Sequence, residues 1–324
     1  MKGSRALIGV ALIFAASCGG DSSEPPADPV AQVERVVFED ALEHEISMQH
    51  PDWALNALGS IWINRETGEV ERIDPGSQEV EATIDTHGYP CQNSVVVERD
   101  LWTIDCETSE LLRMNPVKER VEERIPIDGL PRQTFGSIQL AAGRIWVQAS
   151  GEGGYHLVAV DPRTGDVADP VFVGKEAAGM VASGDRLWVS NPFEGIVYEL
   201  DATTGEVLRT VEGLDEPRWL AASDGSVWTS NDGDGTVSRI DDRTGEVQAT
   251  IPAGDEGAGG YIVAGEGAIW ARPAGTLYVR IDPGTNAVTH ELTGDFGSGG
   301  LAIGFGSMWA TGLEQGKVWR LSLP

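Results

Sequence analysis

The sequence has few basic residues, few cysteines and almost no helix-forming pattern. Its 324 residues include 23 Lys and Arg against 51 Asp and Glu, a formal net charge of −28. A surface this acidic repels nucleic acid and anionic headgroups, so neither is expected as a partner. We interpret the acidic composition mainly as a means of solubility, and attraction of cations as a secondary effect. Apolar residues recur at helical spacing only weakly, at 116–124, so an all-β chain is predicted.

The apolar run at the start of the sequence is short. Ala6–Ala16 follows Lys2 and Arg5, and its 11 residues are too few to cross a bilayer. The next segment, Ala-Ala-Ser-Cys at 15–18, resembles the lipobox of a bacterial lipoprotein signal, which implies cleavage before Cys18 and acylation of its thiol. The alternative is an ordinary secretory signal followed by a chance cysteine.

Both interpretations predict an exported, extracytoplasmic protein. We expect a signal peptide at 1–17, a flexible tether at 18–32 that is rich in Gly, Ser and Pro, and a folded domain at 33–324. With a lipid on Cys18, the protein would touch the membrane through that anchor only.

The segment 220–251, LAASDGSVWTSNDGDGTVSRIDDRTGEVQATI, shows the unit from which the chain is built. Short β-rich or alternating stretches are separated by turns of Asp, Asn and Gly, residues that tolerate positive φ. About forty residues therefore hold four strands joined by hairpins, an antiparallel sheet that is not stable alone.

A tryptophan in the second strand of this unit recurs along the chain. The copies are Trp62, Trp102, Trp146, Trp188, Trp228, Trp270 and Trp309. Their spacing of 39 to 44 residues is typical of β-propeller blades. The sequence therefore predicts a seven-bladed β-propeller with four-stranded antiparallel blades.

The last blade has three strands of its own, at 301–304, 307–310 and 318–321. A strand within 38–46, before the first blade, is predicted to supply the fourth and to close the ring, because closure removes exposed sheet edges. Residues 33–37 form a further short strand or a lead-in.

Two cysteines remain once Cys18 is assigned to the lipid. Cys91 and Cys106 flank the first hairpin of the second blade, and they fall opposite each other when the hairpin pairs about its turn at 98–100. In an exported protein this position predicts a disulfide. A metal site would need a second pair of ligands.

The turn after the third strand repeats as Asp-x-x-Thr-Gly at 161–165, 201–205 and 241–245, with a looser copy at 282–286. Asp binds the backbone amides of such turns, and Gly or Asn takes the left-handed position. We interpret these aspartates as turn formers, because a metal site would not be copied at every hairpin. Asn-Asp-Gly-Asp-Gly at 231–235 is also interpreted as a turn, since it lacks the bidentate Glu of a calcium loop. Neither a metal nor a cofactor is predicted.

Propellers bind at the mouth of the central channel, on loops that lead into first strands and follow second strands. Large side chains precede the first strands, and polar side chains lie two residues after the blade tryptophans. The predicted ligand-binding residues are Asp52, Trp53, Asn64, Tyr89, Arg218, Trp219, Tyr261 and Arg272. Aromatic and polar groups around one concavity suit a small molecule or peptide. The alternative is that the aromatic residues plug the channel.

The repeat Gly-x-hydrophobic-Trp, then Gly-x-Val-x-Arg-Ile-Asp and Thr-Gly-Glu-Val, resembles bacterial seven-bladed propellers of the YVTN/YncE type and the related streptogramin B lyase (virginiamycin B lyase) group. It is clearest at 225–247 and recurs at 184–207 and 59–73. The resemblance implies a propeller over nearly all of the mature chain. Those lyases use histidines, a glutamate and magnesium on late blades, where this sequence has Tyr261 and Arg272.

Two functions remain open. A binding module, the expectation we favour, would hold an unknown small molecule, peptide or protein at the mouth and act as a monomer. An enzyme of the lyase or hydrolase type would use the same face and need an acid–base pair, for which His50 and His87 are candidates. The Gly-x-Ser-x-Gly, His-Glu-x-x-His and phosphate-loop motifs are absent, but a site assembled from separate loops needs none of them.

Overall fold

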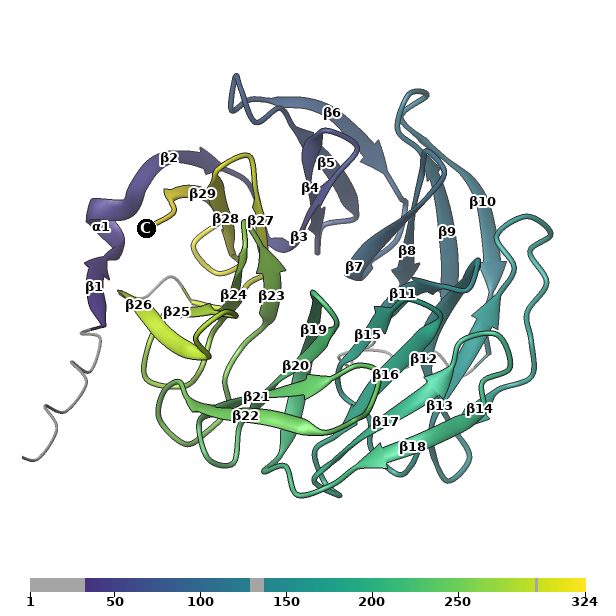
Figure 1. The fold of residues 1–324 in the computed structure, drawn as a ribbon. Helices are drawn as coiled ribbons and strands as arrows, with labels where there is room; N and C mark the ends of the chain where they lie inside the picture. Colours follow the sequence, from purple (N-terminus) through teal and green to yellow (C-terminus); the bar gives the residue numbers. More distant parts are fainter. Residues whose placement is uncertain (1–32, 129–136, 295–296) are drawn as a thin grey trace, which may run out of the picture. The chain divides into compact units, whose positions relative to one another are not determined.

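A computed structural model describes residues 33–128, 137–294 and 297–324. Within the unit Val33–Pro324, the described strands form seven sheets arranged as blades of a ring (Figure 1). The predicted seven-bladed β-propeller is therefore confirmed. The predicted signal peptide, tether and lipidated Cys18 lie outside the described residues and stay predictions.

Blades 1 to 4 each contain four antiparallel strands. They are β3 (Pro51–Ala57), β4 (Ser60–Arg65), β5 (Glu69–Ile73) and β6 (Val80–Asp85); β7 (Pro90–Val97), β8 (Asp100–Asp105), β9 (Glu110–Asn115) and β10 (Arg120–Pro126); β11 (Ile138–Ala141), β12 (Arg144–Gly151), β13 (Gly154–Val160) and β14 (Val171–Phe172); and β15 (Met180–Ser183), β16 (Arg186–Asn191), β17 (Ile196–Asp201) and β18 (Val207–Val211).

Blades 5 to 7 continue the ring. They contain β19 (Pro217–Ser223), β20 (Ser226–Asn231), β21 (Thr236–Asp241) and β22 (Val247–Pro252); β23 (Ile262–Gly265), β24 (Ala268–Ala271), β25 (Tyr278–Asp282) and β26 (Ala287–Thr293); and β27 (Leu301–Gly304), β28 (Ser307–Gly312) and β29 (Lys317–Ser322).

The segment before blade 1 closes the ring, as predicted. β2 (Leu42–Ser47) pairs antiparallel with β29 and supplies the fourth strand of blade 7. The first four residues of the predicted range are not strand: α1 (Phe38–Ala41) is one helical turn whose Phe38 ring packs edge-on against Trp319, with centroids 5.4 Å apart. β1 (Glu34–Val37) adds a fifth strand to blade 6, parallel to β26. One short segment therefore joins blades 6 and 7.

The seven repeated tryptophans are buried in the blades. Each lies in a second strand and is at most 3% exposed. In four blades an arginine from the third strand covers the ring, with its guanidinium carbon 5.0 to 5.9 Å from the ring centroid. This cation–π contact explains the Arg in the repeated Val-x-Arg-Ile-Asp sequence.

The repeated aspartates form turns at the ends of the third strands. The Asp201 carboxylate accepts hydrogen bonds from the backbone amides of Thr203 and Thr204, at 2.8 and 3.1 Å. These backbone bonds lower the pKa of Asp201, and Gly205 takes a φ of +77°. The interpretation of these residues as turn formers is confirmed.

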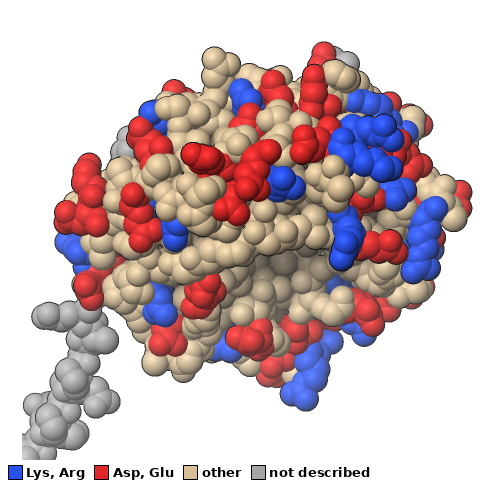
Figure 2. Space-filling view, turned by 90° about the horizontal axis from the view of Figure 1, so that it is seen from above, with Lys and Arg blue, Asp and Glu red and all other residues tan. Residues whose placement is uncertain are grey.

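Acidic and basic side chains are interspersed on the side of the propeller shown in Figure 2. Many are paired across neighbouring strands: Arg113 and Asp100 lie 2.6 Å apart, and Arg209 and Glu199 also lie 2.6 Å apart. Among the described residues, no helix has the length and apolar character needed to span a bilayer.

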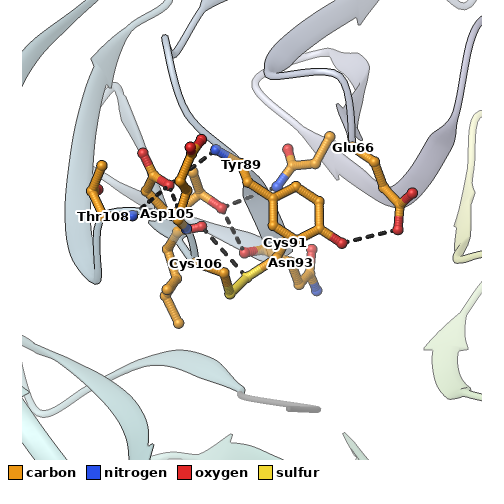
Figure 3. The surroundings of a disulfide bond; sticks show 11 residues. Glu66, Tyr89, Cys91, Asn93, Asp105, Cys106 and Thr108 are labelled. Atoms are coloured by element: carbon orange, nitrogen blue, oxygen red, sulfur yellow. Dashed lines mark hydrogen bonds between the residues drawn. A yellow bond between two sulfur atoms is a disulfide. The ribbon is translucent and has the colours of Figure 1, made fainter. Parts of the chain in front are cut away.

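The predicted disulfide joins Cys91 of β7 to Cys106, the residue after β8 (Figure 3). Their Cα atoms are 5.8 Å apart, and both residues are 5% exposed. The bond closes the irregular end of the first hairpin of blade 2, where the register shifts between Pro90 and Ser94.

Candidate ligand-binding site

First strands begin, and second strands end, at the same end of every blade. We call this end the mouth face, and the end with the Asp-x-x-Thr-Gly turns the turn face. All eight residues predicted to bind a ligand lie in or next to strands at the mouth face, so the topology allows their side chains to meet there.

Three aromatic residues meet at this end. Trp53 of blade 1, Trp219 of blade 5 and Tyr261 of blade 6 have ring centroids 4.4 to 6.2 Å apart. Trp219 is 7% exposed, whereas Trp53 and Tyr261 are half-buried. The blades to which they belong are not all adjacent, so the three rings pack together across the channel.

The channel beside these rings is narrow. A cavity of ≈ 80 Å³ is lined by the three rings and by first-strand residues that include Ile138, Met180 and Leu301. Such a space holds a few water molecules at most. The aromatic residues therefore fill much of the channel, which is the role that the alternative interpretation gave them.

A larger cavity of ≈ 440 Å³ opens next to the rings, on the mouth face of blades 5 to 7. We call it the mouth cavity. Its walls are the loop segments 258–260, 272–276 and 297–299, and three of the predicted residues, Trp219, Tyr261 and Arg272, line it. Its volume is within the range typical of small-molecule sites.

Glycine makes the walls of the mouth cavity possible. A Cβ atom on Gly260 would lie 2.7 Å from Cδ of Arg272, and one on Gly299 would lie 2.0 Å from the backbone oxygen of Thr311. The loops can approach each other this closely only without a side chain. The runs Gly-Ala-Gly-Gly at 257–260 and Gly-Ser-Gly-Gly at 297–300 were the sequence signal for this cavity, which sequence analysis missed.

Irregular pairing at the mouth face gives the site residues their positions. In blade 1 the register shifts between Pro51 and Trp53, so Asp52 is the extra residue of a bulge. Blade 5 has a similar shift between Pro217 and Leu220, the stretch that contains Trp219. Bulges re-aim side chains and are common beside functional sites.

The carboxyl group of Asp52 is half-buried, and it makes no hydrogen bond or ion pair with any described residue. Burial raises its pKa to about 7, and the negative charges of Glu66 and Glu314 add to the effect. The charge of Asp52 in turn raises the pKa of Tyr261, after the larger effect of burial on that phenol. The charge of Asp52 therefore acts on a residue that lines the mouth cavity.

Both predicted arginines support the walls of the cavity. The Nε atom of Arg218 is 2.7 Å from Oδ2 of Asp232, a 5% exposed carboxylate whose other oxygen accepts the amide of Gly259 at 3.3 Å. Arg272 donates through Nη2 to the backbone oxygen of Gly297 at 2.5 Å. The two side chains thus hold loops of blades 6 and 7 in place.

Asn64 is 2% exposed and belongs to the interior. Its Nδ2 atom donates to Oγ of Ser94 at 3.1 Å and to Oγ1 of Thr103 at 3.0 Å, both in blade 2. Gln148, Ser190 and Thr311 occupy the same repeat position. Their side chains donate to backbone oxygens of the following blade: Gln148 to Ala177 at 2.6 Å, Ser190 to Arg218 at 2.5 Å and Thr311 to Asp52 at 2.5 Å.

These polar residues therefore tie each blade to the next. A buried tie and an exposed rim show the same polar pattern in the sequence, so these positions were predicted at the rim of a pocket. Asn64 is buried and takes no part in the site proposed below.

Tyr89 lies away from the three rings. Its hydroxyl donates to Oε1 of Glu66 at 2.9 Å, and its ring packs on the core around the disulfide (Figure 3). Burial, and then the bond to Glu66, raise the pKa of this tyrosine. The two rim histidines are exposed and face different carboxylates: His50 lies 3.8 Å from Glu66, and His87 lies 3.0 Å from Asp85.

Comparison with known proteins gives the fold. No protein-family model and no curated protein matches the sequence. Similar solved structures include the computationally designed protein Ika8, with a TM-score of 0.63, 14% identity and coverage of 83% of this chain and 82% of that chain. The WD40 domain of Pan2 from Neurospora crassa has a TM-score of 0.67, 9% identity and coverage of 85% and 90%.

BamB from Moraxella catarrhalis is also similar, with a TM-score of 0.59, 14% identity and coverage of 83% of each chain. At these identities the likeness shows the propeller fold alone.

Proposed function

We propose that the protein is a binding module whose ligand occupies the mouth cavity. One observation carries this proposal: Trp219, Tyr261 and Arg272, drawn from two blades, line a single cavity of ≈ 440 Å³ whose remaining walls are glycines and other small residues. Aromatic side chains supply contact area at a low entropic cost, and backbone walls supply polar groups in fixed positions. Such a surface suits the body of a small molecule or a peptide side chain.

The wider setting of this module is also proposed. The sequence at 15–18 supports export and acylation at Cys18, and the repeat supports kinship with propellers of the YVTN/YncE type. Radiolabelled palmitate fed to a bacterial expression host tests the anchor. The label is expected in the wild-type chain and not in a Cys18→Ser variant. Label retained in that variant contradicts the anchor.

An enzyme of the lyase or hydrolase type is the second candidate, and Asp52 favours it. A carboxyl group with a pKa of about 7 is suited to general acid–base chemistry near neutral pH. His50 and His87 are less suited, because each is exposed and faces a separate carboxylate. If turnover exists, Asp52→Asn is expected to abolish it while substrate binding persists.

A thermal-shift screen of the full-length protein against a metabolite library tests binding. Ala258→Trp places an indole in the mouth cavity from an exposed position and is expected to remove the shift given by any hit. Thr203→Trp adds the same group to an exposed position on the turn face and serves as the control. If Ala258→Trp keeps the full shift for every hit, the mouth cavity is not the binding site.

A further inference from the structure

We propose that the mouth cavity selects an organic cation, a ligand with an alkylated ammonium group. This inference rests on the proposed binding function and names the class of ligand. Three features carry it: the two arginines of the mouth face are already engaged, the nearby Asp52 carboxylate has no partner among the described residues, and aromatic rings line the cavity.

The positive charges at the mouth face have partners. Arg218 forms an ion pair of 2.7 Å with Asp232, which is buried. Arg272 donates to the backbone oxygen of Gly297 and lies close enough to Glu314 to lower the pKa of that carboxylate, after the larger effect of its hydrogen bond to Ser298. Neither arginine is thus a strong anion site, and a buried ion pair such as that of Arg218 is costly to break.

The described residues leave the negative charge of Asp52 uncompensated. No ion pair or hydrogen bond reaches its carboxylate from the described residues, and its charged neighbours Glu66 and Glu314 are also acidic. Its backbone oxygen accepts the amide of Gly300 at 2.7 Å, so the backbone of Asp52 lies next to the residue that follows the 297–299 wall of the mouth cavity. A cation in the cavity would offset this charge, whereas an anion would be repelled.

The aromatic residues favour a soft cation over a small, strongly hydrated one. Tyr261 and Trp219 line the mouth cavity, and Trp53 packs against both at 4.4 and 6.2 Å between centroids. Ring faces attract alkylated ammonium groups through their quadrupole, and such groups lose little hydration on burial. The acidic surface of the whole chain, with its net charge of −28, attracts the same ligands at longer range.

Three probes that share a branched end but differ in charge separate the effect of charge from that of shape. Choline carries a trimethylammonium group, 3,3-dimethylbutan-1-ol is its neutral isostere, and pivalate is a branched anion of similar bulk. Binding to the full-length protein is measured at pH 8 by isothermal titration and by ligand-observed NMR. Choline is expected to bind saturably, and at least about tenfold more tightly than either of the other two probes.

Asp52→Asn is expected to weaken choline binding by about tenfold and to leave the binding of the neutral probe unchanged. Asp185→Asn removes an exposed carboxylate at the turn face and is expected to change neither. Circular dichroism confirms that each variant is folded before its affinity is compared.

Three results would overturn the inference. Equal affinity for choline and its neutral isostere would show that shape decides, and preferential binding of pivalate would show an anion site. Both leave the mouth cavity as the binding site, so the proposed function survives them. Absence of saturable choline binding would also overturn the inference, and the library screen with Ala258→Trp then tests the proposed function separately.

Discussion

Asp52 at the mouth face and the repeated aspartates at the turn face differ in how their carboxylates are held. At the turn face, Asp201 and Asp241 accept backbone amides of their own turns, and these bonds lower their pKa values. At the mouth face, the Asp52 carboxylate accepts no amide from the described residues, and burial raises its pKa to about 7. The first arrangement stabilises the fold when the carboxylate is charged, whereas the second destabilises it when the carboxyl group is charged. A group kept at a cost to stability is a candidate for function.

Both faces of the propeller depend on closure of the ring. Removal of the closing segment is therefore the change with the largest expected effect. Deletion of residues 19–47 takes away β1, α1 and β2, and it exposes the edge of β29. We expect loss of a single cooperative transition in urea, because blade 7 is left with three strands. Deletion of 19–31 spares these elements and is the control. Equal unfolding curves for the two deletions would contradict the closure.

The disulfide is a covalent tie at the mouth face of blade 2. It closes a loop with a sequence separation of 15 residues, so a Cys91→Ser, Cys106→Ser double variant is expected to lose about 3 kcal/mol of unfolding free energy. Urea denaturation without reductant measures this loss. The wild-type protein in reductant should lose the same amount. No change in either experiment would mean that the bond does not constrain the chain.

Asp52→Asn tests the cost of the mouth-face carboxylate. The pKa of Asp52 is about 7 in the folded protein and 3.8 by reference, so the folded state binds more protons between these values. Stability from this group is therefore lost as pH rises from about 4 to 7. The variant is expected to be more stable than wild type by about 2 kcal/mol at pH 8, a gain that shrinks towards pH 4.

Thermal unfolding from pH 4 to 8 follows this difference. The charges of Glu66 and Glu314 act on Asp52, so the comparison is made between variant and wild type at each pH. A gain that does not depend on pH, or a loss at pH 8, would contradict the account of Asp52.

Asp201→Asn is the matched change at the turn face and has the smallest expected effect, of the opposite sign. The pKa of Asp201 is lowered by backbone hydrogen bonds, so its contribution is present above the reference pKa and lost as pH falls through the folded value. An Asn side chain keeps one acceptor oxygen, and we expect a slight loss of stability at pH 7. Thermal unfolding of both variants at the same pH checks that Asp201→Asn lowers the stability and Asp52→Asn raises it.

The repeated part of the fold could be predicted from the sequence. Tryptophan spacing gave the blades, the position of Cys91 and Cys106 about one turn gave the disulfide, and the unpaired last blade gave the closure. Each of these follows from a local pattern, and such a pattern can be recognised in the sequence because it is repeated. The helical turn before the closing strand could not be predicted, because burial of Ala41 and packing of Phe38 are tertiary contacts.

The site was less predictable, because it depends on departures from the repeat. Asp52 belongs to a bulge that alternation does not reveal, and Tyr89 turns to the disulfide core instead of the channel. Asn64 is polar, as a rim residue would be, but it is buried and its side chain bonds to the next blade. The mouth cavity itself is walled by glycines, whose role depends on how closely two loops approach each other.

Hydrogen–deuterium exchange of the full-length protein, with and without a ligand found by the thermal-shift screen, tests the central claim most directly. The claim is that the mouth face of blades 5 to 7 is the functional surface. Added protection is expected in amides of 257–261 and 272–276, with exchange at the turns 201–205 and 241–245 unchanged. Protection confined to those turns, or to the outer strands β18 and β22, would contradict it.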